Sequence, residues 1–128
     1  MTPETAIAIR DRIAEATQEI RVLCPPRGHF IAVIALCVPE GTGMLVMRPR
    51  GPGKRYVGNV HAGHHGFRMD TYGCAVCHNG APPTGSFNVA LRCTKQRCGY
   101  HGSFAYLPLS FELAALALAG HAEYRLTR

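Results

Sequence analysis

Apolar residues near the start of the chain recur at helical spacing. In residues 2–21 they fall every three or four positions, which predicts an amphipathic helix with one face toward a core. Thr2 is the expected N-cap, and Pro3 suits the first helical position, where no backbone N–H is needed. The Cys24-Pro25-Pro26 run should then turn the chain, because Pro cannot continue a helix. The predicted core stripe consists of Ala6, Ile9, Ile13, Ala16 and Ile20.

A β-hairpin is predicted after this turn. Residues 29–38 are almost wholly apolar, residues 39–43 are mainly turn formers, and a second apolar run covers residues 44–47. Because both faces of the first strand would be apolar, we expect it at the centre of a sheet. One of its faces should be covered by the first helix and the other by a different part of the chain.

The remaining pattern predicts a long loop, a cysteine-rich segment and a short C-terminal helix. Residues 48–66 are rich in Gly, Pro, His and Arg and have no helical period, which is typical of a loop. Ser110 is the expected N-cap of an apolar helix over residues 111–119, and Gly120 is its expected stop. Residues 122–126 could form a closing strand.

These elements predict an α+β fold, in which an N-terminal helix lies on a small antiparallel sheet beside a cysteine module and a C-terminal helix. A length of 128 residues fits a single domain. Its expected segments are residues 1–47 (helix plus β-hairpin), 48–66 (basic Gly/Pro/His loop), 67–106 (cysteine module) and 107–128 (C-terminal helix and strand).

Composition favours a folded protein of the cytosol. Apolar residues make up 47% and charged residues 17% of the chain, unlike disordered sequences. Residues 1–21 mix acidic and basic side chains and lack the apolar run of a secretory signal. The longest apolar run, residues 30–38, is much shorter than the ~20 residues that cross a bilayer. We therefore expect a cytoplasmic protein without a membrane partner.

Four of the six cysteines have the spacing of a zinc site. Two residues separate Cys74 from Cys77, and four residues separate Cys93 from Cys98. In a reducing cytosol such pairs point to metal rather than to disulfides, and a tight turn directs both thiolates of a pair toward one ion. The sequence thus predicts a structural Zn²⁺ held by Cys74, Cys77, Cys93 and Cys98.

Residues 67–106 resemble a zinc ribbon through the pattern Cys74-x2-Cys77-x15-Cys93-x4-Cys98-Gly-Tyr. The resemblance covers about a third of the chain and implies two hairpin knuckles that clamp one zinc ion. It implies no single function, because zinc ribbons occur in transcription, replication, transposition and ribosomal proteins. Residues 24–29 also resemble, over a short stretch, small uncharacterised proteins of actinobacteria and their phages.

Histidines leave several alternatives open for the metal chemistry. His78 or His101 could replace one thiolate, and Cys24 with His29 could form a second metal half-site instead of an ordinary turn. The Cys74-Ala-Val-Cys77-His78 run also spells a c-type haem attachment motif, but that reading leaves the second cysteine pair without a role.

The histidines also raise an enzymatic reading. His78 and Asn88, between the cysteine pairs, resemble loosely the HNH-like nucleases that carry such residues between zinc-binding cysteines. The interval is too short and His64-His65 precedes the first pair, so we expect no enzyme.

Positive charge is concentrated in the middle of the chain. The formal net charge is +6, and between Glu40 and Glu112 the only acidic residue is Asp70. Cations interleaved with aromatic residues are typical of surfaces that bind phosphates and stack on bases.

We expect a small zinc-stabilised accessory or regulatory protein that binds DNA or RNA. The alternative is a protein-interaction module that docks on the transcription or replication machinery, or on a partner from a phage or mobile element. The expected phosphate contacts are Arg48, Arg50, Lys54, Arg55, Arg68, Arg92, Lys95 and Arg97.

Overall fold

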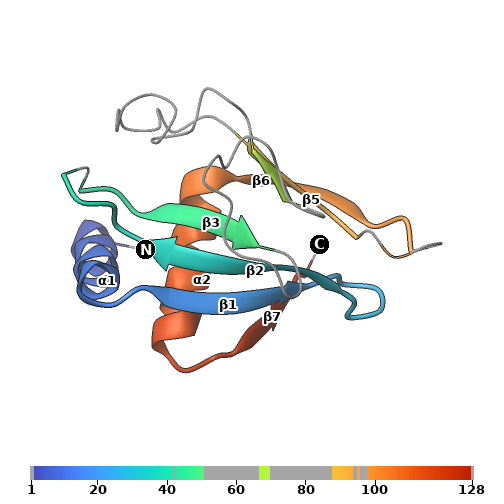
Figure 1. Ribbon diagram of the computed structural model, residues 1–128, viewed down its shortest axis with the longest axis horizontal. Coiled ribbons are helices and arrows are strands. Elements are labelled where there is room, and N and C mark those ends of the chain that lie inside the picture. Colours follow the sequence, from blue (N-terminus) through green and yellow to red (C-terminus); the bar gives the residue numbers. More distant parts are fainter. Residues whose placement is uncertain are drawn as a thin grey trace.

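The computed structural model in Figure 1 describes residues 2–41, 43–50, 67–69, 88–93, 95 and 98–127. These residues form two helices and two β-sheets with their connecting loops, which confirms the predicted α+β class. The elements are α1 (Pro3–Glu15), β1 (Gln18–Leu23), β2 (Phe30–Cys37), β3 (Val46–Arg50), β4 (Phe67–Met69), β5 (Asn88–Arg92), β6 (His101–Ala105), α2 (Tyr106–Leu118) and β7 (Glu123–Arg125).

Helix α1 begins as predicted and ends earlier. The Thr2 hydroxyl accepts a hydrogen bond from the Thr5 backbone N–H at 3.1 Å, and Pro3 occupies the first helical position. Ile9 and Ile13 are its buried residues. The helix ends at Glu15, so the predicted helical range of residues 2–21 is too long.

The last part of that range forms strand β1. From Gln18 to Leu23 polar and apolar residues alternate, and Ile20 and Val22 are buried while Glu19 and Arg21 are exposed. Ile20 fits both periods, because it lies four residues after Ala16 and two before Val22. The period of two prevails because β1 completes its backbone hydrogen bonds by pairing with β2.

The larger sheet has the strand order β3-β2-β1-β7. Strand β2 lies between β1 and β3, antiparallel to both, as the apolar run of residues 29–38 predicts. All its residues from Ile31 to Leu36 are buried. Figure 1 shows α2 behind this sheet and α1 at one end of it.

The C-terminal strand changes the character of the sheet. The predicted closing strand forms as β7, over Glu123–Arg125, and pairs parallel to β1. The four-stranded sheet is therefore mixed rather than purely antiparallel. Parallel strands must be joined by a connection that crosses over the sheet. Helix α2 is the last element of the connection from β1 to β7.

A second, three-stranded antiparallel sheet has the order β4-β5-β6. Strand β5, over Asn88–Arg92, is the middle strand of this sheet. In Figure 1 the β5–β6 turn lies at the same end of the molecule as the β1–β2 turn. Two hairpin loops that are distant in sequence are thus neighbours in space.

Helix α2 begins earlier than predicted. It starts at Tyr106 directly after β6, so Ser110 is inside the helix and is not its N-cap. The Ser110 hydroxyl is fully buried and donates to the Leu107 carbonyl oxygen at 2.8 Å, which satisfies it within the helix. Pro108 is tolerated because it lies in the first turn. The expected stop holds, since Gly120 follows the helix with a φ of +95°.

One hydrophobic core joins both sheets and both helices. Ile13 of α1, Ile34 of β2, Leu91 of β5 and Leu113 of α2 are all at most 1% exposed and belong to one cluster. At the edge strand β3, the Met47 backbone N–H donates to the buried Tyr106 hydroxyl oxygen at 2.8 Å. These contacts fix the small sheet, and its hairpin loop, relative to the large sheet.

Candidate metal centre

The β1–β2 loop brings Cys24 and His29 to one end of the molecule. The Cys24 backbone N–H donates to the His29 carbonyl oxygen at 2.8 Å, and the Gly28 N–H donates to the Cys24 carbonyl oxygen at 2.9 Å. Gly28 has a φ of +66°, a left-handed conformation that residues with a Cβ rarely adopt. The His29 N–H also donates to the Cys24 sulfur at 3.2 Å. The loop therefore folds around the Cys24 thiol.

The β5–β6 loop is built in a similar way around Cys93 and Cys98. The Cys93 N–H donates to the Tyr100 carbonyl oxygen at 3.0 Å, and the Cys98 N–H donates to the Lys95 carbonyl oxygen at 3.2 Å. Gly99, with a φ of +71°, follows Cys98 and turns the chain back into β6. Each of the two loops thus contributes two residues of types that ligate metals.

The four side chains converge on one point. The Cys24 and Cys98 sulfurs are 3.7 Å apart, and the Cys93 sulfur is 3.5 Å from His29 Nδ1. All four ligand atoms lie within 4.8 Å of one another. In tetrahedral zinc, bond lengths of ~2.3 Å to sulfur and ~2.0 Å to nitrogen place neighbouring ligand atoms about 3.5–3.8 Å apart. The Cys3His cluster could therefore hold a metal ion with little movement.

Burial and hydrogen bonding act in opposite directions on the thiols of the cluster. Burial, opposed by a hydrogen bond from the backbone N–H of Lys95 and helped by the nearby Cys98 and Cys24, raises the pKa of the Cys93 thiol from its ordinary 9.0 to about 11. Burial also acts upward on the pKa of Cys24. There, hydrogen bonds from the N–H groups of Arg27 and His29, and from Cys98 and Cys93, outweigh it and lower the pKa. A bound cation would stabilise all three thiolates together.

The cluster combines the predicted ligands Cys93 and Cys98 with two residues that are not in the predicted ligand set. Cys93 and Cys98 lie together, as predicted, but beside Cys24 and His29, for which the sequence suggests only a second half-site. His101 is exposed on β6 and is not a member of the cluster. The predicted ligands Cys74 and Cys77, and the alternative ligand His78, lie outside the described residues.

A sequence signal for this pairing existed. Cys24 and His29 are separated by four residues, as are Cys93 and Cys98, and a glycine stands next to the second ligand in both loops. The remaining cysteine of the described chain, Cys37, lies elsewhere on β2. Its sulfur donates to the Val46 carbonyl oxygen at 3.9 Å.

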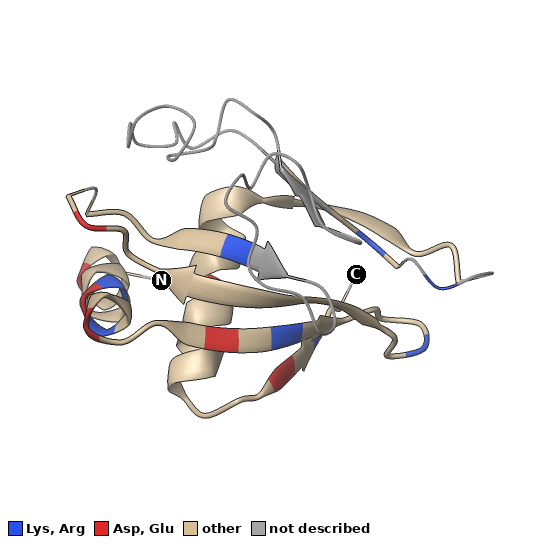
Figure 2. Ribbon diagram, in the orientation of Figure 1, with Lys and Arg blue, Asp and Glu red and all other residues tan. Residues whose placement is uncertain are grey.

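Cationic residues lie on or beside the two loops that carry the cluster. Arg27 of the first loop, Lys95 of the second loop and Arg92 at the end of β5 are exposed. Neither loop sequence contains an acidic residue. Figure 2 shows basic residues at both hairpin turns, whereas α1 carries basic and acidic residues together. Arg125 of β7 donates from Nε to the Pro25 carbonyl oxygen at 2.9 Å, which ties the sheet edge to the first loop.

Of the predicted phosphate contacts, the structure places two at this end of the molecule. Arg92 and Lys95 are exposed there, but Arg48 is half-buried on β3, with an Nε that has no hydrogen-bond partner among the described residues. The backbones of Arg50 and Arg68 belong to β3 and β4. The predicted contacts outside the described residues are Lys54, Arg55 and Arg97.

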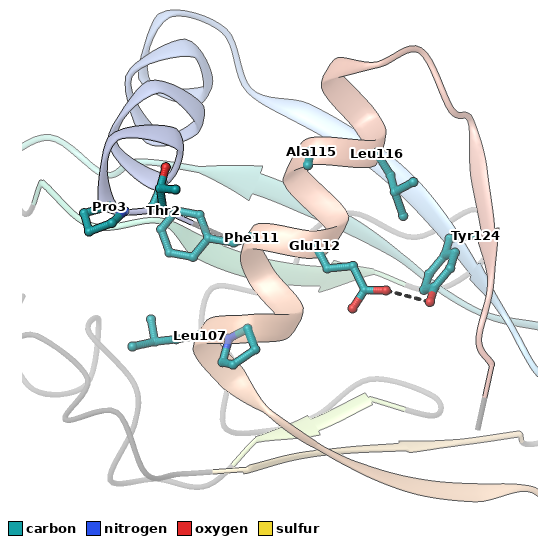
Figure 3. A pocket seen from close by; sticks show the side chains of 10 residues that line it. Thr2, Pro3, Leu107, Phe111, Glu112, Ala115, Leu116 and Tyr124 are labelled. Carbon is teal, nitrogen blue, oxygen red and sulfur yellow. Dashed lines mark hydrogen bonds between the residues drawn. The ribbon is translucent and has the colours of Figure 1, made fainter.

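An apolar groove lies apart from the metal cluster, between α1 and α2. It has a volume of about 790 Å³ and is lined by Pro3, Ala6, Phe111 and other residues of α2. Figure 3 shows Phe111 between the two helices and Glu112 beside Tyr124, whose hydroxyl donates to the Glu112 carboxylate at 2.7 Å. Glu112 is the only charged residue among the lining side chains.

Comparisons with known protein families, with curated proteins and with solved structures found no match to this chain. Neither α1 nor α2 has the length and continuous apolar character that a bilayer crossing requires, and the described residues contain no other helix.

Proposed function

We propose that Cys24, His29, Cys93 and Cys98 bind one structural Zn²⁺. The convergence of these four ligand atoms within 4.8 Å supports this proposal most directly. Thiolate and imidazole ligands suit zinc and disfavour Ca²⁺ and Mg²⁺, which take oxygen ligands. Four protein ligands leave no coordination position for water, so the ion would hold the β1–β2 and β5–β6 loops together rather than catalyse a reaction.

The proposed role of the metal-bearing end is to bind DNA or RNA without enzymatic activity. Support comes from Arg27 and Lys95, which are exposed on the two loops that the zinc would join, and from Arg92, which is exposed at the end of β5 next to the second loop. Zn²⁺ with three thiolates carries a net charge of −1, so three cations leave these loops positive. A rigid pair of cationic hairpin loops would contact phosphates without paying to order the loops on binding.

The decisive experiment measures binding of duplex and single-stranded DNA and RNA as salt is raised. An Arg27→Ala/Lys95→Ala variant should bind more weakly and lower the salt slope by roughly two, because each phosphate contact contributes about one. An Arg10→Ala/Arg12→Ala variant, which removes two cations from α1, is the matched control and should bind like the parent. Affinity no tighter than roughly micromolar at low salt would reject the proposal.

The groove between α1 and α2 favours a second candidate, a protein-interaction module. Its apolar lining suits the hydrophobic face of a partner helix, with a Lys or Arg of that helix near Glu112. An Ala6→Glu substitution would then prevent partner binding, since Ala6 is half-buried in the lining. The Arg27→Ala/Lys95→Ala variant distinguishes the two candidate functions, because it should bind nucleic acid more weakly but still bind a protein partner at the groove.

A further inference from the structure

The proposed zinc ligands include two cysteines from different hairpins whose sulfurs are close together. Cys24 and Cys98 are 3.7 Å apart across the cluster and 74 positions apart in the chain. A disulfide needs a sulfur–sulfur distance of about 2.05 Å, so the two sulfurs must move closer together before they can bond. Both thiols are free in the structure.

Exposure distinguishes the cysteines of the cluster. Cys24 is 0% and Cys93 is 5% exposed, whereas Cys98 is only partly buried. Among the three cysteines of the cluster, Cys98 is therefore the residue most accessible to an oxidant from solvent. Thiolate character and access together decide which cysteine is oxidised, and zinc coordination supplies the thiolate.

We infer that the centre is a redox-sensitive zinc site, in which hydrogen peroxide joins Cys24 to Cys98 and releases the metal. This inference rests on the proposed zinc site. The Cys98 thiolate attacks the peroxide O–O bond, takes one oxygen to become a sulfenic acid, and hydroxide leaves. The Cys24 thiolate then attacks the Cys98 sulfur and displaces a second hydroxide. Two thiolates lose two electrons, and the peroxide gains them.

Loss of zinc follows from the number of ligands that remain. After the disulfide forms, His29 and Cys93 are the two of the four proposed ligands that retain donor atoms, and two ligands do not complete the tetrahedral coordination of a structural site. The new bond still links the two hairpin loops, so oxidation would replace a metal crosslink by a covalent one. Reduction would return both thiols and allow zinc to bind again.

The test treats the zinc-loaded, full-length protein with hydrogen peroxide. Released zinc is followed with a chromophoric chelator, and the disulfide is mapped by mass spectrometry of peptides. The expected result is one zinc ion lost per Cys24–Cys98 disulfide, with recovery of zinc binding after a thiol reductant. A Cys37→Ser variant is the matched control and should respond like the parent, because Cys37 is outside the cluster.

Two outcomes would overturn the inference. One is zinc that stays bound while Cys98 is oxidised to sulfinic acid, and the other is zinc release with a disulfide that pairs different cysteines. A Cys93→Ser variant gives an independent check, since it should still form the Cys24–Cys98 disulfide even if it binds zinc poorly. Failure of the zinc proposal itself has a separate signature, which is a reduced protein that holds no zinc before peroxide is added.

Discussion

Replacement of Cys24 by serine tests the ligand set that the structure assembles. The Cys24 sulfur is fully buried, lies 3.7 Å from that of Cys98 and accepts a hydrogen bond from the His29 N–H. Serine has nearly the same shape but binds zinc weakly as a neutral hydroxyl. The substitution should therefore remove one ligand while the loop keeps its backbone hydrogen bonds.

The expected loss of affinity is large. Structural zinc sites bind with roughly 10–16 kcal/mol, so an equal share for each of four ligands is about 2.5–4 kcal/mol. This corresponds to a dissociation constant raised by about a hundredfold to a thousandfold. At a free zinc concentration well above the Kd of both proteins, the free energy of unfolding should fall by about 2.5–4 kcal/mol, since metal binding to the folded state stabilises it.

The assay is a competition titration with a zinc chelator, together with denaturant unfolding at buffered zinc concentrations. Cys37→Ser is the control and should keep the parent affinity, because Cys37 lies on β2 away from the cluster. Cys74→Ser separates the two ligand sets, since the sequence-based set requires Cys74 and the proposed set does not. Parent-like zinc affinity in Cys24→Ser, with zinc lost in Cys74→Ser, would refute the reasoning.

Three further predictions concern the loops, the core and the thiols. Tyr106→Phe leaves the buried Met47 N–H without its partner and should lower the free energy of unfolding by about 1–3 kcal/mol in a denaturant titration. Gly28→Ala forces a left-handed backbone onto a residue with a Cβ, so it should cost ~1–2 kcal/mol and weaken zinc binding, whereas Gly28→Asn should cost less. Burial raises the pKa of the Cys37 thiol despite the charge of Arg48, so its iodoacetamide alkylation should be slower than that of a free thiol at pH 8. Because this pKa is raised on folding, its contribution to stability is complete below the ordinary 9.0 and is lost as pH rises through the folded value, which unfolding at pH 8 and above pH 9 would detect.

Local physics explains which elements the sequence could predict. The Thr2-Pro3 start of α1 and the turn-flanked apolar run of β2 are determined within a few residues, and both form as expected. The predicted end of α1 and the predicted start of α2 are wrong, because two local patterns compete at each of these positions. Ile20 fits both a helical and a strand period. Ser110 could cap a helix, but it can equally lie inside one and donate to the Leu107 carbonyl oxygen. Pairing of β1 with β2 and the direct run of β6 into α2 decide these cases.

The candidate metal site, too, could be predicted from the sequence only in part. Spacing alone marked Cys93 and Cys98 as ligands, because a short loop places two sulfurs near one ion whatever the rest of the chain does. Their partners depend on which other loop the fold brings opposite. The shared core, which joins Ile34 of the large sheet to Leu91 of the small one, sets the two hairpins side by side and carries Cys24 and His29 to the cysteine pair. The sequence by itself thus determined the chemistry of the ligands, while only the tertiary structure decided which four of them meet, because that meeting depends on contacts between residues more than sixty positions apart.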